Sequence, residues 1–394
     1  MRAHLIARSV AGGHLPACRR PTRTPLRRSA HLVNAQSPSK VVRQTRVGVA
    51  TNGAAEASVD MRQVLEQLLD RKDLAEDVCQ SALQTLLVNE EPAQMAAFLT
   101  LLRAKGETAE EIAGLAKAMR AAAVTVHTPY DVVDIVGTGG DDIGSVNIST
   151  GSAIVAAAAG AKVAKHGNRS VSSLCGSADV LEALGVKVEL GPDAVAKCVE
   201  EVGIAFMFSP RYHPAMKAVA PVRRSLKIRT AFNFLGPMLN PANAKYALVG
   251  VYDTSVSKKM ADALLRLGVE KALVVHSQGL DELTPMGDAD VMEVTPAGVR
   301  SYVLNPRDLG IPACTVEDLK GGDAQFNAKV LRDVFAGEKN AVADALCLNA
   351  GVALASAKVA ATPEEGIAMA QEAQRSGKAL EVLDAWVALS NKLD

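Results

Sequence analysis

A strand-like run that ends in a glycine loop and leads into a helix is the feature that most constrains this fold. The apolar run Val132–Val136 is followed by the string GTGGD at 137–141, and an alanine-rich helix is predicted over 149–159. A second short strand is predicted at 162–164. Strands that alternate with helices in this way are typical of a mainly parallel sheet with helices on its faces.

The glycine loop favours an anion as its ligand. Glycine lets backbone N–H groups approach an anion at φ values that other residues avoid, and consecutive N–H groups of such a turn form an anion-binding nest. The start of the next helix adds unpaired N–H groups and the positive end of the helix dipole. Asn147, Ser149 and Thr150 stand at that start, and all three are residue types that cap helices and donate to phosphate oxygens.

A second polar run, KHGNRSVSS at 165–173, follows the second predicted strand. Because parallel strands place their carboxyl ends at one edge of the sheet, both polar loops are expected there, with Lys165 as a point charge on the same ligand. No P-loop string is present, and Asp142 stands where a dinucleotide fingerprint needs its third glycine. The pattern therefore indicates a ligand with several phosphates, bound in neither of these two ways.

The chain resembles the anthranilate phosphoribosyltransferase family at these loops and at further segments. The matching strings are GTGGD (137–141), NIST (147–150), KHGNRSVSS (165–173), GSADVLEALG (176–185), HPAMKAVAPVRRSLKIRTAFNFLGPMLNP (213–241) and LDEL (280–283). The resemblance runs from about Val64 to the C-terminus. Several independent motifs in one order make it specific.

The resemblance implies a reaction, a metal and a fold. In this family the amine of anthranilate displaces pyrophosphate from C1 of 5-phosphoribosyl 1-diphosphate (PRPP), a step of tryptophan biosynthesis that requires Mg²⁺. The implied fold is α/β and resembles that of class II nucleoside phosphorylases, with a small N-terminal helical domain packed on a larger α/β domain around a central, mainly parallel sheet. The family also implies a homodimer, for which the helical domain is the expected contact surface.

The resemblance also assigns roles to single residues. The residues expected to bind PRPP are Gly137, Gly140, Asp141, Ser145, Asn147, Ser149, Thr150, Lys165, Gly167, Asn168, Arg169, Ser173 and Ser177. Those expected at anthranilate are Gly137, Asn168, Arg223, His166 and His213, and those expected at the metal are Ser149, Asp281 and Glu282. No covalent nucleophile is expected, because the aniline nitrogen is already unprotonated at pH 7. His166 is a weak candidate for a base that takes the amine proton late.

The chemistry of the residues agrees with these roles. Mg²⁺ is commonly held by one or two carboxylates together with substrate oxygens and waters, and Asp281-Glu282 is the best such pair. Neighbours on a strand point to opposite faces, so the pair can act together only from a loop, which Leu280 and Pro285 favour. Arg223 offers a guanidinium that can hold a carboxylate through two hydrogen bonds. Arg224 faces another side of its helix and is expected to be structural.

Three alternatives stay open at this point. A pyrimidine nucleoside phosphorylase of the same fold would bind free phosphate and carry a differently spelled Lys-Ser-Gly-Arg segment. A related phosphoribosyltransferase could use another aromatic amine as its acceptor. A regulatory protein without turnover could keep the binding loops; metal-dependent binding of PRPP would separate an active site from a vestigial one.

The first 55 residues differ from the rest in charge. They contain nine Arg, one Lys and no acidic residue; removing these ten leaves 33 basic against 43 acidic residues. An Arg-rich, acid-free leader is typical of a transit peptide. The resemblance favours the chloroplast stroma over the mitochondrion, with cleavage somewhere in 35–58. We expect no nucleic-acid partner, because the body lacks a basic stripe with aromatics, and no membrane span, because no apolar run is long enough.

The expected organisation is a leader at 1–55, a helical domain at 58–124 joined by part of 211–235, and an α/β domain at 125–394. Four or five helices are predicted up to Arg120, since Val64, Leu65, Leu68 and Leu69 recur at helical spacing. The other predicted elements are helices at 177–184, 192–202, 214–219, 224–232 and 255–267, strands at 186–190, 204–208, 247–252 and 273–276, further strands to about 304, and three C-terminal helices.

Overall fold

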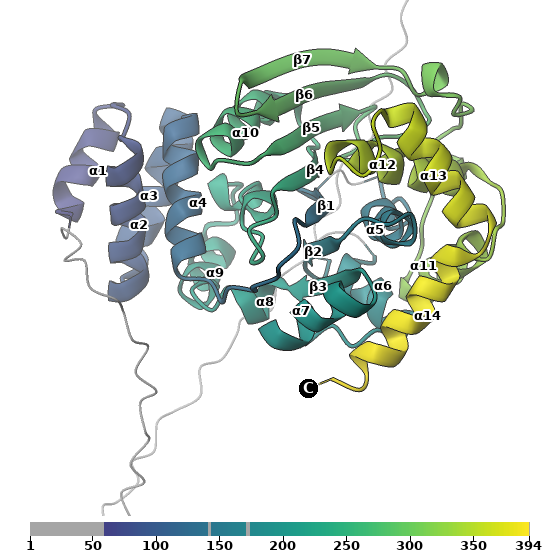
Figure 1. Ribbon diagram of the computed structural model, residues 1–394. Coiled ribbons are helices and arrows are strands. Elements are labelled where there is room, and N and C mark those ends of the chain that lie inside the picture. The colour runs from purple at the N-terminus through teal and green to yellow at the C-terminus, as the bar shows by residue number, and fades with distance from the viewer. Residues whose placement is uncertain (1–58, 141–142, 171–173, 394) are drawn as a thin grey trace, which may run out of the picture. The chain divides into compact units, whose positions relative to one another are not determined.

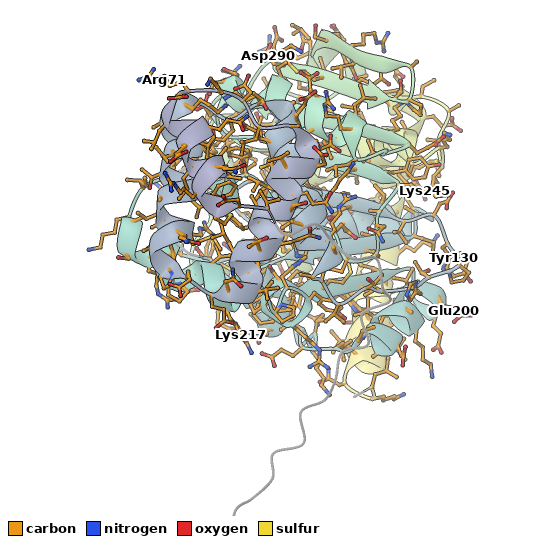
Figure 2. The ribbon with its side chains drawn as sticks, turned by 90° about the vertical axis from the view of Figure 1, so that its left-hand side faces the viewer. Arg71, Tyr130, Glu200, Lys217, Lys245 and Asp290 are labelled. Carbon is orange, nitrogen blue, oxygen red and sulfur yellow. The ribbon has the colours of Figure 1, made fainter. Side chains whose placement is uncertain are left out.

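The computed structural model describes residues 59–140, 143–170 and 174–393. Its first elements are four helices, as predicted: α1 (Met61–Leu69), α2 (Glu76–Asn89), α3 (Pro92–Lys105) and α4 (Ala109–Ala121). Asp60 caps α1 by accepting a hydrogen bond from Arg62 N–H, and Thr108 with Glu111 forms a capping box on α4. Val64 and Leu68 are buried in this bundle, whereas Leu69 is exposed. The bundle faces the viewer in Figure 2, with Arg71 on its outer surface.

A seven-stranded sheet carries the rest of the described chain (Figure 1). Its order is β3-β2-β1-β4-β5-β6-β7. The first five strands in this order pair in parallel, whereas β6 pairs antiparallel with both β5 and β7. The strands are β1 (Val133–Gly137), β2 (Val163–Gly167), β3 (Ile204–Phe208), β4 (Tyr246–Gly250), β5 (Lys271–Ser277), β6 (Ala289–Thr295) and β7 (Gly298–Leu304). The prediction of an α/β fold with a mainly parallel sheet is confirmed.

Helices cover both faces of this sheet. The longer ones are α5 (Ile148–Ala158), α7 (Pro192–Glu201), α9 (Met216–Leu226), α10 (Thr254–Arg266), α11 (Ala324–Phe335), α12 (Ala341–Ser356), α13 (Pro363–Arg375) and α14 (Lys378–Ser390). The shorter ones are α6 (Ser177–Ala183), α8 (Ser209–Tyr212) and the 3₁₀ turns η1 (Ala231–Asn233), η2 (Gly236–Met238), η3 (Pro306–Leu309) and η4 (Glu317–Leu319). None of these described helices has the length and apolar character needed to cross a membrane.

Alternate residues of the strands enter two different cores. In β4, Leu248 packs with α5 and α12, whereas Ala247 and Val249 pack with α10 and the helical bundle. Strands that are buried on both faces need apolar residues at nearly every position, which is why residues 132–136 are apolar except for Asp134.

Three element predictions are wrong. Residues 186–190 bury every second side chain, but they pair with no strand among the described residues. One helix, α9, replaces the two predicted around 214–232, because the helix continues through Pro221. Four helices instead of three end the chain, since only a two-residue turn, with Gly377 at φ +80°, separates α13 from α14.

Candidate active site

The predicted site residues gather where the sheet reverses its winding direction. The chain runs outward from β1 to β2 and β3 and then returns to β4 on the other side of β1. In open α/β sheets, such a switch point leaves a crevice at the carboxyl ends of the strands. The last residues of β1 and β4, Gly137 and Gly250, are paired in register at this point.

Asp281 lies directly on these two glycines. A Cβ on Gly250 would stand 1.5 Å from the carbonyl oxygen of Asp281, and a Cβ on Gly137 would stand 2.3 Å from its Oδ2. Gly139 N–H donates a hydrogen bond of 2.6 Å to the same Oδ2. The loop between β5 and β6 carries Asp281 and Glu282 and is called the carboxylate loop below. Glycine is required at the ends of both strands, because this loop packs against their backbone and leaves no room for a side chain.

Glu282 reaches the start of the helix that follows the glycine loop. Ser149 N–H, in the first turn of α5, donates to Glu282 Oε1 at 3.2 Å. Burial and the neighbouring Asp281 charge raise the pKa of Glu282 to about 8, while Lys165 and Ser149 act in the opposite direction. The structure thus brings the three predicted metal residues, Ser149, Asp281 and Glu282, together.

Lys165 is a buried cation beside this carboxylate pair. Its Nζ donates to the carbonyl oxygen of Ile135 in the adjacent strand. Burial lowers the pKa of Lys165, and the charges of Asp134, Glu282 and Asp281 oppose that shift. Asp134 was not anticipated from the sequence; it is buried, accepts from His166 N–H at 3.2 Å and from Asn240 Nδ2 at 2.7 Å, and burial raises its pKa to about 6.

The side chains of Ser149, Asp281 and Glu282 offer ligands that suit Mg²⁺ better than a transition metal. Two carboxylates and a hydroxyl are hard oxygen ligands, and Mg²⁺ keeps several waters or substrate oxygens in its shell. Within the described residues, no group of three or more His, Cys, Asp and Glu side chains is arranged to hold a metal. A metal bound by Asp281 and Glu282 must therefore take further oxygens from its substrate or from water.

The loop between β1 and α5 is held by a segment far along the chain. Asn147 accepts from Asn327 Nδ2 at 2.9 Å through its Oδ1, and its own Nδ2 donates to the carbonyl oxygen of Cys175 at 3.0 Å. Ser145 forms a β-bridge with Lys320. Asn147 occupies the N-cap position of α5, but its side chain does not cap the helix. Asn327 carried no signal in the sequence, because its partner is 180 residues away.

The second polar loop joins the first through the starts of α5 and α6. Thr150 Oγ1 donates to Ser177 Oγ at 3.0 Å, and Gly167 lies under the ring of Phe206 and close to Ser177. Asn168 and Arg169 are exposed. Arg169 pairs with Glu182 and Asp179 on α6, an arrangement that raises its pKa. Asp141 and Ser173, also expected at PRPP, lie outside the described residues.

Two of the residues expected at anthranilate, His166 and His213, lie together on the other face of β2 from Lys165. Successive strand residues alternate in direction, so His166 points away from the side that Lys165 occupies. The rings of His166 and His213 are 5.0 Å apart, and His166 Nδ1 lies 3.3 Å from the carbonyl oxygen of Gly236. Burial lowers the pKa of His166 to about 3 and that of His213 to about 4. Both rings are neutral at pH 7, and His166 is a poor base there.

Arg223 has no counter-ion among the described residues. It is half-buried, its guanidinium lies over the ring of Phe232 at 5.9 Å, and burial lowers its pKa. It forms no hydrogen bond or ion pair with Asn168, His166 or the described part of the glycine loop. Arg229, which sequence reasoning missed, reaches that loop: it lies 4.3 Å from the centre of the Tyr252 ring and 3.4 Å from Gly140 O.

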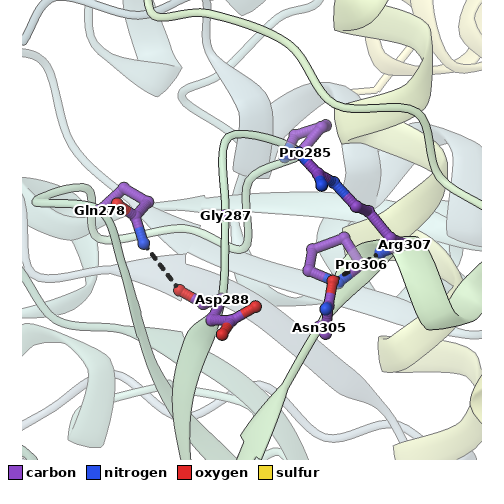
Figure 3. Close-up of a pocket in the computed structure, with 7 residues that line it drawn as sticks. All are labelled: Gln278, Pro285, Gly287, Asp288, Asn305, Pro306 and Arg307. Carbon is purple, nitrogen blue, oxygen red and sulfur yellow. Dashed lines mark hydrogen bonds between the residues drawn. The ribbon is translucent and has the colours of Figure 1, made fainter.

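A cavity of about 300 Å³ lies elsewhere on the carboxylate loop (Figure 3). It is lined by Gln278, Pro285, Gly287, Asp288, Asn305, Pro306 and Arg307. Gln278 Nε2 donates to the carbonyl oxygen of Asp288 across it at 3.1 Å. None of the predicted site residues lines this cavity, so the open space and the site chemistry do not coincide.

Comparisons with known proteins agree with this geometry. The glycosyl transferase family a/b domain matches residues 129–380, and the glycosyl transferase family helical bundle domain matches residues 62–123. A protein of Chlamydia felis named anthranilate phosphoribosyltransferase is 44% identical over 330 residues, which are 84% of this chain and 96% of the relative.

Solved structures give the same result. The anthranilate phosphoribosyltransferase of Thermus thermophilus superposes with a TM-score of 0.79 at 42% identity, covering 83% of this chain and 99% of the other. The Saccharomyces cerevisiae enzyme, solved in complex with PRPP and Mg, gives a TM-score of 0.79 at 27% identity, covering 86% of this chain and 100% of the other. This chain belongs to the anthranilate phosphoribosyltransferase family.

Proposed function

We propose that this protein transfers the 5-phosphoribosyl group of PRPP to the amine of anthranilate and releases pyrophosphate, with Mg²⁺ as cofactor, in tryptophan biosynthesis. The relatives named above support this activity, and a yeast relative is solved with 4-fluoroanthranilate. The observation that supports it most directly is the close packing of Asp281 against Gly137 and Gly250, together with the hydrogen bond between Glu282 and the first turn of α5.

The residues proposed to bind PRPP and Mg²⁺, which form the donor half of the site, suit a pyrophosphate leaving group. Bound Mg²⁺ would neutralise negative charge that grows on the leaving oxygens. The chain's contribution is to present two carboxylates for that ion from one loop and to surround them with Gly139 N–H, the first turn of α5 and Lys165. These groups are fixed by the fold before the substrate arrives, so little reorganisation accompanies the reaction.

The reaction needs orientation more than activation. The lone pair of the aniline nitrogen forms a bond to C1 of the ribose while the bond from C1 to the pyrophosphate oxygen breaks. The nitrogen then loses one proton to water or to a base. Since His166 has a pKa of about 3, the structure favours water over this histidine. Holding the two substrates in line supplies most of the rate acceleration in this scheme.

Arg223 is the proposed anchor for the carboxylate of anthranilate. A half-buried guanidinium without a partner costs free energy, and a bound carboxylate would offset that cost with two parallel hydrogen bonds. This role also separates anthranilate from other aromatic amines, because an acceptor without an ortho carboxylate leaves the guanidinium unpaired.

The activity can be tested with the full-length chain, PRPP, Mg²⁺ and anthranilate, by following the loss of anthranilate fluorescence. We expect a loss that requires all three components, together with release of one pyrophosphate per anthranilate consumed. A folded protein that binds PRPP with Mg²⁺ but consumes no anthranilate would contradict the proposed acceptor. A panel of aromatic amines would then identify the acceptor.

We also propose a homodimer formed through the helical bundle. Leu69 and Val88 of this bundle are 65% and 82% exposed, which is unusual for large apolar side chains unless a partner covers them. Light scattering of the eluted protein should give twice the chain mass. Val88→Asp should shift the protein toward the monomer, whereas Val303→Asp, at an exposed apolar residue of β7, should leave the dimer intact.

Finally, we propose that residues 1–55 direct the protein to the chloroplast stroma. The support for a transit peptide is its composition of ten basic residues and no acidic one, and the family's place in tryptophan biosynthesis favours the chloroplast over the mitochondrion. Residues 1–60 fused to a fluorescent protein should be imported by isolated chloroplasts and shortened on import. Import by mitochondria instead, or no import, would contradict this assignment.

A further inference from the structure

Asn349 contacts the carboxylate loop at Leu283, two residues after Asp281. It belongs to α12, which packs on α5 and β4 (Figure 1), and its side chain is completely buried. Its Nδ2 donates to the carbonyl oxygen of Leu283 at 2.7 Å, and Leu283 N–H donates to its Oδ1 at 3.1 Å. The side-chain amide thus pairs with both backbone groups of the residue that follows Glu282.

The remaining hydrogen bond of this amide is also satisfied. Nδ2 donates to Ala345 O, one helical turn earlier, at 2.9 Å. A buried amide is tolerated only when its donors and acceptor are bonded. Alanine, valine and leucine make up most of α12, so a polar side chain at this position stands out, and its contact with Leu283 is the only one of its hydrogen bonds that leaves the helix.

The loop is closed at its other end as well. Ser277 and Leu280 exchange backbone hydrogen bonds of 3.3 and 2.9 Å, and Ser277 Oγ lies 3.0 Å from Thr284 Oγ1. Asp281 and Glu282 are therefore held between two fixed points. The second of these, at Leu283, depends on a side chain from another part of the chain.

The loop needs such a restraint because it holds two neighbouring carboxylates, of which Asp281 is buried and Glu282 is half-buried. Like charges side by side repel each other, and withdrawing charges from water costs free energy, so both effects favour a loop that turns one carboxylate away. A residue that fixes the backbone next to Glu282 opposes this movement. Partners of metal ligands act in this manner and alter metal affinity by about 10–100-fold when removed.

We infer that Asn349 is a positioning residue: by pairing with the backbone of Leu283, it keeps Asp281 and Glu282 turned together for the magnesium complex of PRPP. This inference rests on the proposed function, because it needs the two carboxylates to bind the metal. Asn349 itself touches neither substrate nor metal.

The decisive variant is Asn349→Leu, which fills the same space and removes all three hydrogen bonds. Gln374→Leu is the matched control: Gln374 is a buried amide that donates to the backbone oxygens of Val334 and Glu338 at 2.6 and 2.9 Å, away from the loop. Both variants leave buried backbone groups unpaired and should lower the free energy of unfolding by about 1–3 kcal/mol. Only the first should alter the metal site.

The test measures binding of PRPP by calorimetry at several Mg²⁺ concentrations, without anthranilate, so that no turnover is needed. We expect Asn349→Leu to raise the Kd of the magnesium complex of PRPP by about 10–100-fold, with the KM for anthranilate changed less than about twofold. Gln374→Leu should leave both constants at the wild-type value. Equal effects of the two variants, or an unchanged Kd in Asn349→Leu, would overturn the positioning role.

Two further measurements keep the outcome clear. If Asn349→Leu does not fold, Asn349→Asp replaces it: the carboxylate can still accept from Leu283 N–H but cannot donate to Leu283 O, so the Kd should rise again, and a wild-type Kd would overturn the inference. If the wild-type protein does not bind PRPP in a Mg²⁺-dependent manner, or binds it equally well after Asp281→Asn with Glu282→Gln, the proposed metal site fails and this inference fails with it.

Discussion

The part of the site proposed to bind PRPP and Mg²⁺, the donor half, is built differently from the part proposed to bind anthranilate, the acceptor half. In the donor half, Asp281 and Lys165 are buried, Glu282 is half-buried, and each of the three forms a hydrogen bond with a backbone group. In the acceptor half, Arg223 has no counter-ion among the described residues, and His166 Nε2 is buried without a hydrogen-bond partner there. The donor half has its polar groups arranged by the fold alone, whereas the acceptor half leaves polar groups unsatisfied.

This difference agrees with what each half is proposed to bind. A pyrophosphate with Mg²⁺ carries several charges, and charges are best stabilised by groups that are fixed in advance. Anthranilate carries one carboxylate and an apolar ring, which an unpaired guanidinium and neutral imidazoles would suit. A buried polar group without a partner is costly, and the ligand removes that cost when it binds.

The largest expected effect comes from the donor half. Asp281→Asn together with Glu282→Gln keeps the shape of the loop and removes both charges, and should lower kcat/KM by about 10²–10³-fold, the cost of losing transition-state charge stabilisation. Steady-state rates over a range of Mg²⁺ concentrations measure this loss. Asp288→Asn is the control, since Asp288 lies further along the same loop and lines the cavity of Figure 3. A comparable loss in the control would mean that general damage to the loop is the cause.

A substitution in the acceptor half should change the KM of anthranilate but not that of PRPP. Arg223→Ala removes the proposed carboxylate anchor and should raise the KM for anthranilate by about 10–100-fold, which corresponds to about 1.5–3 kcal/mol for a charged hydrogen bond, while the KM for PRPP stays nearly constant. Arg224→Ala, at the exposed neighbour on α9, should change neither constant. If PRPP binding weakens instead, Arg223 belongs to the donor half and the division proposed here is wrong.

The close packing of the donor half can be tested through Gly137. Gly137→Ala places a methyl group against the Asp281 carboxylate, and overpacking of this kind costs about 1–3 kcal/mol. The apparent affinity for Mg²⁺ should fall with it, because Asp281 must move. Gly139→Ala meets no atom within 4 Å and strains only the backbone at φ +70°. It should lower the free energy of unfolding by about 1–2 kcal/mol and leave the dependence on Mg²⁺ unchanged, as urea unfolding and kinetics would show.

Local strings predicted that Ser149, Lys165, Asp281 and Glu282 lie together at one edge of the sheet, because each belongs to a short polar string that follows a strand. Three strings each indicate a strand end followed by polar groups: the glycine loop, the polar run after β2 and the Asp281-Glu282 pair. Parallel strands bring such ends to one edge of the sheet. The assignments of single residues to PRPP, anthranilate and the metal remain predictions.

The supports of the site could not be predicted in this way. Asn327 and Asn349 contact loops that lie 180 and 66 residues away in sequence, and no local pattern marks an asparagine in a helix as a partner of a distant loop. The same limit explains the incorrect strand at 186–190, where every second side chain is buried although the backbone pairs with no strand among the described residues. Local periodicity reports which side chains are buried, but not which backbone groups pair.

The smallest expected effect concerns the neutral imidazoles of the acceptor half. Burial lowers the pKa of His213 to about 4, below the value near 6.5 of the unfolded chain. Between these values the unfolded chain binds a proton that the folded chain does not, so the stability that His213 contributes is present above pH 6.5 and is lost as the pH falls toward 4. The wild type should lose about 1 kcal/mol more than His213→Gln between about pH 7 and pH 5.5.

Urea unfolding of both proteins at several pH values measures this difference. The buried Asp134 shifts stability in the opposite sense, since its folded pKa of about 6 lies above the unfolded value, but its contribution is common to both proteins and cancels. Equal slopes for the two proteins would mean that His213 stays accessible to protons, and hence that solvent already occupies the acceptor half. A steeper slope in the wild type would show that this half excludes water before anthranilate binds, which is the property that the proposed Arg223 anchor requires.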